Sequence, residues 1–201
     1  MARRSEHSQE EIREMILVAA EIIVREEGFS ELKVRKVAME VDYTVGTIYM
    51  VFDNLDDLIM HVKARTLDKL AHHLEVTVSG ESPEIQLVEL AKAYLAFAIS
   101  NFELWNMIFI HRLPGTNSIP QWYQTRVENL FQPVERLFKA LAPDKAVNDI
   151  EKAARALWGG IHGICFLSLT GKLDVAGIHD VEECIILQVE SFVRGWAGKG
   201  A

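Results

Sequence analysis

Small and hydroxyl-bearing side chains follow Thr44 at the spacing of one short helix, and their chemistry suits contact with DNA. Such side chains allow close approach, contact thymine methyl groups, and donate hydrogen bonds to base edges or phosphates. Ile48 and Phe52, one helical turn apart, would pack the opposite face against a neighbouring helix. We therefore predict that the residues of this helix that contact DNA are Thr44, Val45, Gly46, Thr47 and Tyr49.

A preceding short helix and a tight turn would position these residues. Apolar side chains recur at helical spacing between Leu32 and Val41. Asp42 and Tyr43 follow as a turn, and the Thr44 hydroxyl is suited to cap the next helix. This layout is a helix-turn-helix, in which the second helix enters the major groove with its N-terminal residues. A helical hairpin within a helical core is the alternative, since this geometry also occurs outside DNA-binding proteins.

The flanking segments favour DNA binding over the hairpin. An amphipathic helix is expected from Gln9 to Glu27, ended by Gly28. Asn54 or Asp53 is placed to cap a fourth helix. The positions in fixed register are Gly28-Phe29, Val34-x-x-Val37-Ala38, Thr44-x-Gly46-Thr47-Ile48-Tyr49-x-x-Phe52 and Leu58. Over roughly residues 9 to 70, this order resembles the N-terminal domain of the TetR family of transcriptional regulators.

The sequence departs from the pattern of that family at four positions. The family usually has Gly at the position of Asp42, and a Lys that contacts phosphate at the position of Leu55. Asp adopts a left-handed turn conformation more readily than most residues, so we expect the turn to be kept. Met50 and Val51 replace the usual His or aromatic residues. The resemblance therefore implies fewer phosphate contacts, with weaker or more salt-sensitive DNA binding.

The charge balance is acidic, which is unusual for a nucleic-acid-binding chain. There are 21 Lys and Arg against 29 Asp and Glu, a net charge of −8, and residues 1 to 65 hold nine basic and thirteen acidic groups, or −4. The basic groups nevertheless cluster, in an arm with Arg3 and Arg4 and in the group Lys33, Arg35 and Lys36, and we predict that the last three contact DNA. The arm is equally consistent with a solvated tail. Arg35 matches a family position from which a side chain reaches a base edge, where Arg pairs with guanine.

Composition indicates an ordinary globular chain of 201 residues, 49% hydrophobic and 25% charged. No apolar run of about 18 residues occurs, and the N-terminal segment does not read as a signal peptide, so we expect a cytoplasmic protein without a membrane span. Cys165 and Cys184 lie in apolar segments that are predicted to be helical. We predict reduced core cysteines rather than a disulfide or a metal site.

The whole chain is predicted to be all-α, with two domains. Residues 1–66 form an N-terminal three-helix helix-turn-helix domain, and residues 67–201 form a C-terminal helical domain for ligand binding and dimerisation. Ser82 followed by Pro83 marks a helix start after the long fourth helix. Further helices are expected at about 84–100, 102–112, 120–141, 148–170 and 180–196, with linkers at 142–144 and 171–177.

The last two helices are apolar over broad faces, and a small protomer cannot easily bury both. Pairing with their symmetry mates as a four-helix bundle would cover them, and Gly159, Gly160 and Gly163 permit close approach. The alternative is that both helices belong to the core of a monomer. The predicted dimer interface is Leu157, Ile161, Ile164, Leu167, Ile185, Val189, Phe192 and Trp196.

Aromatic side chains concentrate in the C-terminal helices. The segment Trp158 to Gly163 also resembles a C-terminal ligand domain, named for its Trp, His and Gly, of one TetR subgroup. Apolar walls with a few polar groups describe a small-molecule pocket, and they also describe a core. A satisfied core histidine is likewise the alternative for His162. The predicted pocket residues are Phe97, Trp105, Phe109, Trp122, Tyr123, Trp158, His162 and Phe166.

Catalytic and cofactor motifs are not apparent in the sequence. His72, His73 and Glu75 lack the i, i+4 spacing of helical zinc sites, and we find no nucleophile elbow, P-loop or glycine-rich fingerprint. The remaining alternative is an all-α enzyme whose catalytic groups are scattered along the sequence and form no recognisable motif. The sequence thus predicts a homodimeric regulator that binds a palindromic operator, a repressor relieved by a small, largely apolar ligand, without cofactor or metal. The alternative is an all-α dimeric small-molecule-binding protein on the same fold with little DNA affinity.

Overall fold

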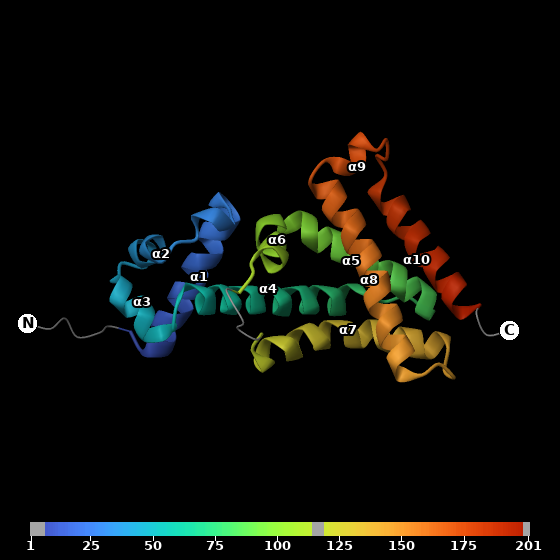
Figure 1. Cartoon of the computed structure of the whole chain (residues 1–201), viewed down its shortest axis with the longest axis horizontal. Coiled ribbons are helices and arrows are strands. Elements are labelled where there is room, and N and C mark those ends of the chain that lie inside the picture. Colours follow the sequence, from blue (N-terminus) through green and yellow to red (C-terminus); the bar gives the residue numbers. More distant parts are fainter. Residues whose placement is uncertain (1–6, 114–118, 199–201) are drawn as a thin grey trace, which may run out of the picture. The chain divides into compact units, whose positions relative to one another are not determined.

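The computed structural model describes residues 7–113 and 119–198, and within them all regular structure is helical, as predicted (Figure 1). The elements are α1 (Gln9–Glu27), η1 (Phe29–Glu31), α2 (Val34–Glu40), α3 (Val45–Val51), α4 (Leu55–Thr77), α5 (Pro83–Ser100), α6 (Phe102–Ile110), α7 (Gln121–Leu141), α8 (Val147–Leu169), α9 (Lys172–Val175) and α10 (Val181–Ala197). Each helix expected from the sequence is therefore present, with ends that differ by a few residues.

Short-range hydrogen bonds explain where several helices begin and end. Ser8 and Glu11 form a reciprocal capping box at the start of α1, with the Ser8 N–H donating to the Glu11 carboxylate at 2.7 Å. Gly28 ends α1 at φ +89°, a conformation that favours glycine. The Ser82 hydroxyl accepts from the Ile85 N–H at the start of α5, as predicted from the Ser-Pro pair.

The chain divides into two compact units. The first consists of residues 1–66 and 101–123, and the second of residues 67–100 and 124–201. The domain boundary predicted from the sequence, after residue 66, falls at the same place as one border of the first unit. However, α6 and the first residues of α7 belong to the first unit, whereas the boundary predicted from the sequence assigns them to the C-terminal domain. Leu104 and Met107 of α6 join its buried core, so packing rather than chain order determines this membership.

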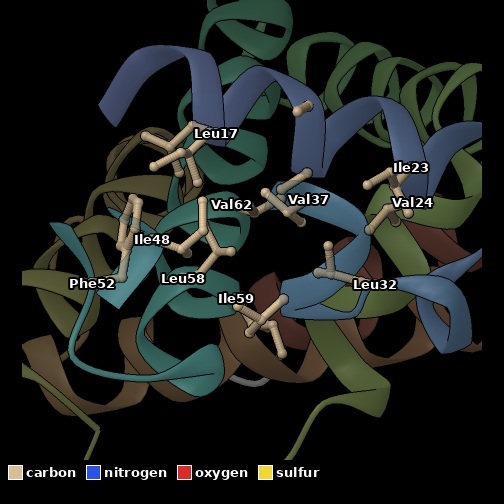
Figure 2. Close-up of a cluster of buried hydrophobic side chains, with 14 of the residues drawn as sticks. Leu17, Ile23, Val24, Leu32, Val37, Ile48, Phe52, Leu58, Ile59 and Val62 are labelled. Atoms are coloured by element: carbon tan, nitrogen blue, oxygen red, sulfur yellow. The ribbon is translucent and has the colours of Figure 1, made fainter. Parts of the chain in front are cut away.

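The core of the first unit brings together α1, α2, α3, the first half of α4 and α6 (Figure 2). Burial of each such aliphatic side chain is worth about 1.5–3 kcal/mol relative to exposure. Several of them are inaccessible to solvent, including Ile16, Val24, Val37, Leu58 and Val62. This core holds α2 and α3 at a fixed angle, which is what a helix-turn-helix requires.

In the second unit, α8 and α10 lie side by side and both pack on α5 (Figure 1). At Gly160 of α8, the Gln188 side chain of α10 occupies the space where a Cβ would stand, with its amide nitrogen 2.6 Å from that position. Phe138 of α7 is fully buried and meets Trp196 edge to face, with ring centroids 4.8 Å apart. Cys165 is also buried, and burial raises the pKa of its thiol to about 12, so it stays protonated. Cys184 is free too, but it is only partly buried, in contrast to the expected core position.

Two short elements were missed by the sequence analysis. They are η1 and α9, which occupies the expected linker at 171–177. Elements of three or four residues are too short to show a hydrophobic period. Gly171, at φ +70°, separates α8 from α9. Within residues 7–113 and 119–198, no individual helix combines the length and apolar character of a membrane span; only α5 and α6 taken together, as a bent pair, would do so.

Candidate DNA-binding site

The turn between α2 and α3 has the geometry of a helix-turn-helix. Asp42 has φ +54°, the one positive φ of a non-glycine residue in the described part of the chain. The expected left-handed turn is therefore kept with Asp in place of Gly. The Thr44 hydroxyl accepts a hydrogen bond from the Thr47 N–H at 3.2 Å, which confirms Thr44 as the N-cap of α3. The hydroxyls of these two threonines also lie 3.1 Å apart.

The two faces of α3 differ sharply in exposure. Ile48 and Phe52 are 1% and 2% exposed and pack into the core, as their spacing predicts. On the outer face, Tyr49 is 50% exposed and Met50 is 79% exposed. Gly46 is exposed as well, so backbone can approach a partner closely at this point. The outer face thus presents a phenol, a thioether and bare backbone.

Some residues flanking this face are turned toward the core instead. Val45, predicted as a DNA contact, is partly buried and packs against the core cluster, together with Val51 and Leu55. Leu55 therefore has an apolar packing role at the position where the family commonly has a phosphate-binding Lys. Asn54 caps α4, because its side-chain oxygen accepts from the Asp57 N–H at 2.9 Å. This settles the choice that the sequence left open between Asn54 and Asp53.

The basic residues of α2, and the lysine just before it, are not equally available to contact DNA. Lys33 forms an ion pair with Glu31 at 3.2 Å, and Lys36 forms one with Glu27. Arg35 is exposed and has no hydrogen bond or ion pair to any residue that the structure describes. Of the three predicted basic contacts, Arg35 is therefore the one whose charge is uncompensated. Arg3 and Arg4 lie outside the described residues.

A network of polar and aromatic side chains packs against the C-terminal end of α3. It was not predicted from the sequence. The Arg13 guanidinium donates to Nδ1 of His61 at 3.0 Å and lies 5.1 Å from the centre of the Phe52 ring. His61 also stacks on Trp122, with ring centroids 4.7 Å apart and planes 7° from parallel. These contacts tie α1, the end of α3, α4 and the start of α7 together. No local signal reveals them, because the partners are far apart in sequence.

The predicted pocket residues are divided between the two units. Trp105, Phe109, Trp122 and Tyr123 belong to the first unit, whereas Phe97, Trp158, His162 and Phe166 belong to the second. Trp105 is fully buried and meets Phe109 edge to face, which favours the core interpretation for Trp105.

His162 is the centre of the aromatic group in the second unit. It stacks on Trp158 with ring centroids 5.2 Å apart, and its Nδ1 lies 3.0 Å from the Tyr94 hydroxyl. Phe166, one turn further along α8, also stacks with His162, with ring centroids 6.4 Å apart. Burial lowers the pKa of His162, which favours the neutral imidazole. Phe97 lies elsewhere in this unit, next to His73.

A surface groove of about 390 Å³ in the second unit involves none of the predicted pocket residues. It is lined by residues of α4, α5 and α7 and by Val78, and Glu75 and Arg136 are its charged lining residues. The apolar lining residues are Ala71, Leu74, Val78, Leu90, Leu130, Pro133 and Leu137.

Half of the predicted dimer-interface residues are buried inside the protomer. Leu157, Ile161, Ile185 and Val189 are 7% exposed or less, so they hold α8 and α10 together within one chain. Leu167 is 43% exposed, and Ile164, Phe192 and Trp196 are partly exposed. Leu187 of α10 is 64% exposed and is not among the interface residues predicted from the sequence. Helical periodicity identifies an apolar face but does not tell which neighbour covers it.

Comparison with known proteins defines the class of this fold. Residues 87–192 match a family model described as the tetracyclin repressor-like C-terminal domain. The match covers more than half of the chain, including the segment from Trp158 to Gly163. The chain belongs to the TetR family of transcriptional regulators, as the N-terminal motif predicted.

Individual relatives are distant in sequence. An uncharacterized HTH-type transcriptional regulator of Mycobacterium tuberculosis, Rv0681, is 24% identical over 162 residues, which is 81% of this chain and 72% of the relative. A protein of unknown function from Rhodococcus sp. RHA1 superimposes with a TM-score of 0.75 at 22% identity, over 97% of this chain and 98% of that one. BioQ, solved with its double-stranded DNA operator, superimposes with a TM-score of 0.63 at 17% identity, over 92% and 98% of the two chains.

Proposed function

We propose that the chain is a homodimeric cytoplasmic repressor that binds a palindromic DNA operator through α2 and α3, and is released by a small, largely apolar ligand. The observation that carries DNA binding is the outer face of α3, where Tyr49 stands exposed opposite the buried Ile48. Arg35 on α2 adds a cation without a counter-ion in the described chain. The solved complex of BioQ with its operator, on the same fold, supports this proposal.

Dimerisation is supported by the apolar surface of the second unit. Leu187 of α10 and Phe166 and Leu167 of α8 are all more than 40% exposed. Gly159 and Gly163 on α8 have open space where a Cβ would stand, so a second helix can approach there. A second copy of the chain would cover these side chains and place two recognition helices about 34 Å apart, one turn of DNA.

Ligand control is supported by the aromatic group around His162 in the second unit and by the aromatic residues of the first. A ligand lowers operator affinity only to the extent that it binds the released conformation more tightly than the bound one. We propose that the bound ligand favours a dimer whose recognition helices no longer match the groove spacing.

A second candidate is a small-molecule-binding dimer with little DNA affinity. The ion pairs of Lys33 and Lys36 with acidic neighbours favour it, because they withdraw positive charge from the candidate surface. So does Leu55, whose side chain packs against the core where a phosphate-binding group is common in the family.

The two candidates differ in salt dependence. We would titrate the protein with DNA from upstream of its own gene at about 50 mM and about 200 mM salt. Tight binding that weakens steeply with salt supports the regulator, and no binding at either salt supports the second candidate. Arg35→Ala should weaken binding by about 10- to 100-fold and relax base preference, since a bidentate contact to guanine contributes about 1–3 kcal/mol.

Tyr49→Ala provides a second variant at the same surface, and we expect about tenfold weaker binding. Lys152→Ala serves as the control, because this exposed lysine lies on α8 in the other unit. Binding as in the wild type by both surface variants would contradict the assignment of α2 and α3 as the DNA-binding elements.

A further inference from the structure

Lys63, in the middle of α4, is almost completely enclosed. Only 6% of the residue is exposed. The residues around it on the helix, Met60, Val62, Ala64 and Thr66, are each 3% exposed or less, so α4 is covered on nearly every side at this point. A lysine is almost never found this deeply buried without a partner. The side chain therefore needs an explanation beyond solubility or surface charge.

No anionic group of the described chain compensates Lys63. Its ammonium nitrogen has neither a hydrogen bond nor an ion pair to a described residue, and its recorded contact is with the ring of Tyr123, whose centre is 5.4 Å away. Two acidic residues of this unit have other partners. Asp56 pairs with His111 and Glu21 with Arg65. Desolvation of an ammonium group that has no anionic partner is unfavourable, so the fold retains Lys63 at a cost.

Tyr123 adds a second donor at the same place. It is 5% exposed, and its hydroxyl makes no hydrogen bond to a described residue. Burial raises its pKa to about 12, so the hydroxyl keeps its proton and can donate. Burial lowers the pKa of Lys63 to about 8, which leaves most of the amine protonated near neutral pH. Lys63 and Tyr123 are thus in direct contact, and each has a hydrogen-bond donor that no described residue uses.

The surroundings indicate the charge and the polarity of a matching ligand. One ammonium group is compensated by one negative charge, whereas a dianionic phosphate would leave a second charge buried and unpaired. Trp122 meets the Tyr123 ring edge to face at 5.9 Å between centroids, and Met60 lies one turn before Lys63. These side chains favour an apolar or aromatic body attached to the charged group.

We propose that Lys63 and Tyr123 form the anion-binding end of a small-molecule site in the first unit, and that its ligand is an apolar monocarboxylate. One carboxylate oxygen accepts from the Lys63 ammonium group and the other accepts from the Tyr123 hydroxyl. This inference rests on the small-molecule part of the proposed function and narrows its ligand to an apolar acid. Neither periodicity nor the aromatic pattern identified Lys63, because a lysine in a helix normally indicates a solvated face.

The test compares acids with their uncharged counterparts on the full-length protein. The probes are benzoate, phenylacetate and octanoate, each paired with its primary amide, at up to about 10 mM. Binding is followed by thermal unfolding and by tryptophan fluorescence, since Trp122 lies beside the proposed site. We expect at least one acid to raise Tm and change the fluorescence, while its amide has at least a tenfold weaker effect.

Variants assign that preference to particular groups. Lys63→Met should abolish the difference between acid and amide, and should fold with an equal or higher Tm, because it removes an unpaired buried charge. Lys63→Arg should keep part of the preference for the acid, and Tyr123→Phe should weaken binding of the acid by about tenfold. Lys152→Met, at an exposed lysine of the other unit, should bind as the wild type does.

Three outcomes would overturn the site: no acid binds, acid and amide act equally, or the acid binds Lys63→Met unchanged. If Lys63→Met does not fold, Lys63→Arg and Tyr123→Phe test the site in its place, and unchanged binding of the acid by both variants would overturn it. Failure of the wider function is distinguishable, because these measurements contain no DNA. Acids that bind at Lys63 without altering operator affinity would leave the site in place and contradict only its role in releasing the operator.

Discussion

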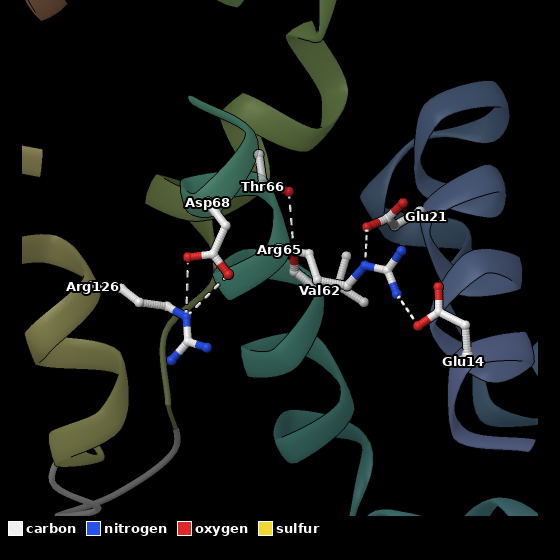
Figure 3. Close-up of polar contacts among 7 residues, drawn as sticks. All are labelled: Glu14, Glu21, Val62, Arg65, Thr66, Asp68 and Arg126. Atoms are coloured by element: carbon white, nitrogen blue, oxygen red, sulfur yellow. Dashed lines mark hydrogen bonds and ion pairs between the residues drawn. The ribbon is translucent and has the colours of Figure 1, made fainter. Parts of the chain in front are cut away.

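The Nε of Arg65 lies 2.8 Å from a carboxylate oxygen of Glu21, whose side chain is 6% exposed (Figure 3). The same guanidinium contacts Glu14 at 2.6 Å, so one arginine of α4 serves two carboxylates of α1. Partial burial acts to lower the pKa of Arg65, but hydrogen bonds and ion pairs with these two carboxylates together outweigh it and raise the pKa. This contact anchors α1 to α4 in the unit that carries the candidate DNA-binding surface.

Arg65→Met should lower the free energy of unfolding by about 2–4 kcal/mol, because it removes the cation paired with the buried Glu21 carboxylate. Glu21→Leu combined with Arg65→Met should recover more than half of that loss, since both charges of the pair are then removed together. Urea unfolding of the wild type, both single variants and the double variant gives the coupling energy. A stability of Arg65→Met within 0.5 kcal/mol of the wild type, as an approximate limit, would show that the pair contributes little.

Substitutions at Asp42 test the left-handed turn. Asp42 is exposed at φ +54°, so its effect on stability comes from the backbone rather than from packing. Asp42→Ala should cost about 1 kcal/mol, whereas Asp42→Gly should be at least as stable as the wild type. Urea unfolding of the two variants checks this order. Equal stability of the Ala and Gly variants would mean that the turn relaxes to another conformation.

His162 should make stability depend on pH in the weakly acidic range. Burial lowers its pKa in the folded chain, so between that value and about 6.5 the unfolded chain binds more protons. The neutral imidazole therefore contributes stability above about pH 6.5, and this contribution is lost as the pH falls toward the folded pKa. Between pH 7.5 and 5.5, approximate limits that bracket this value, the wild type should lose more Tm than His162→Gln.

His72→Gln, at an exposed position of α4, is the matched control for that experiment. It should follow the wild type, and superimposable curves for all three proteins would contradict the assigned role of His162.

Leu187→Glu tests the proposed dimer. Leu187 is 64% exposed in the protomer, so the substitution should leave the protomer folded while placing a charge in the contact with a second copy. We expect dissociation to become at least about 100-fold easier and operator affinity to fall with it. Sedimentation velocity measures the first effect and a mobility-shift titration the second. Val76→Glu, at an exposed apolar residue of α4, is the control that should stay dimeric.

Much of the fold could be read from the sequence because its signals are local. The Thr44 cap, the Ser82-Pro83 start and the apolar period of α1 each depend on residues within one or two turns. The family assignment likewise followed from a fixed register of residues over a short segment. Helix ends and short elements such as α9 were harder to predict from the sequence, because three or four residues are too few to show a helical repeat of apolar side chains.

The candidate sites depended far more on long-range contacts. The sequence indicated Tyr49 from its place on the second helix and Arg35 from its match to a family position, and the structure leaves both exposed. It gave no indication that Lys36 would pair with Glu27 across the break at Gly28, nor that Val45 would pack inward. It also grouped aromatic residues that packing distributes between two units.

The sequence by itself determined the all-α class, the helix-turn-helix and the family, because helical period, caps and motif register are properties of neighbouring residues. Only the tertiary structure decided which polar and charged groups have partners. Arg65 gains two carboxylates and Lys36 gains one, whereas Lys63 is enclosed with a tyrosine ring and no anion. The physical reason is that burial and ion pairing arise between residues brought together from distant parts of the chain, and a linear pattern does not contain those distances.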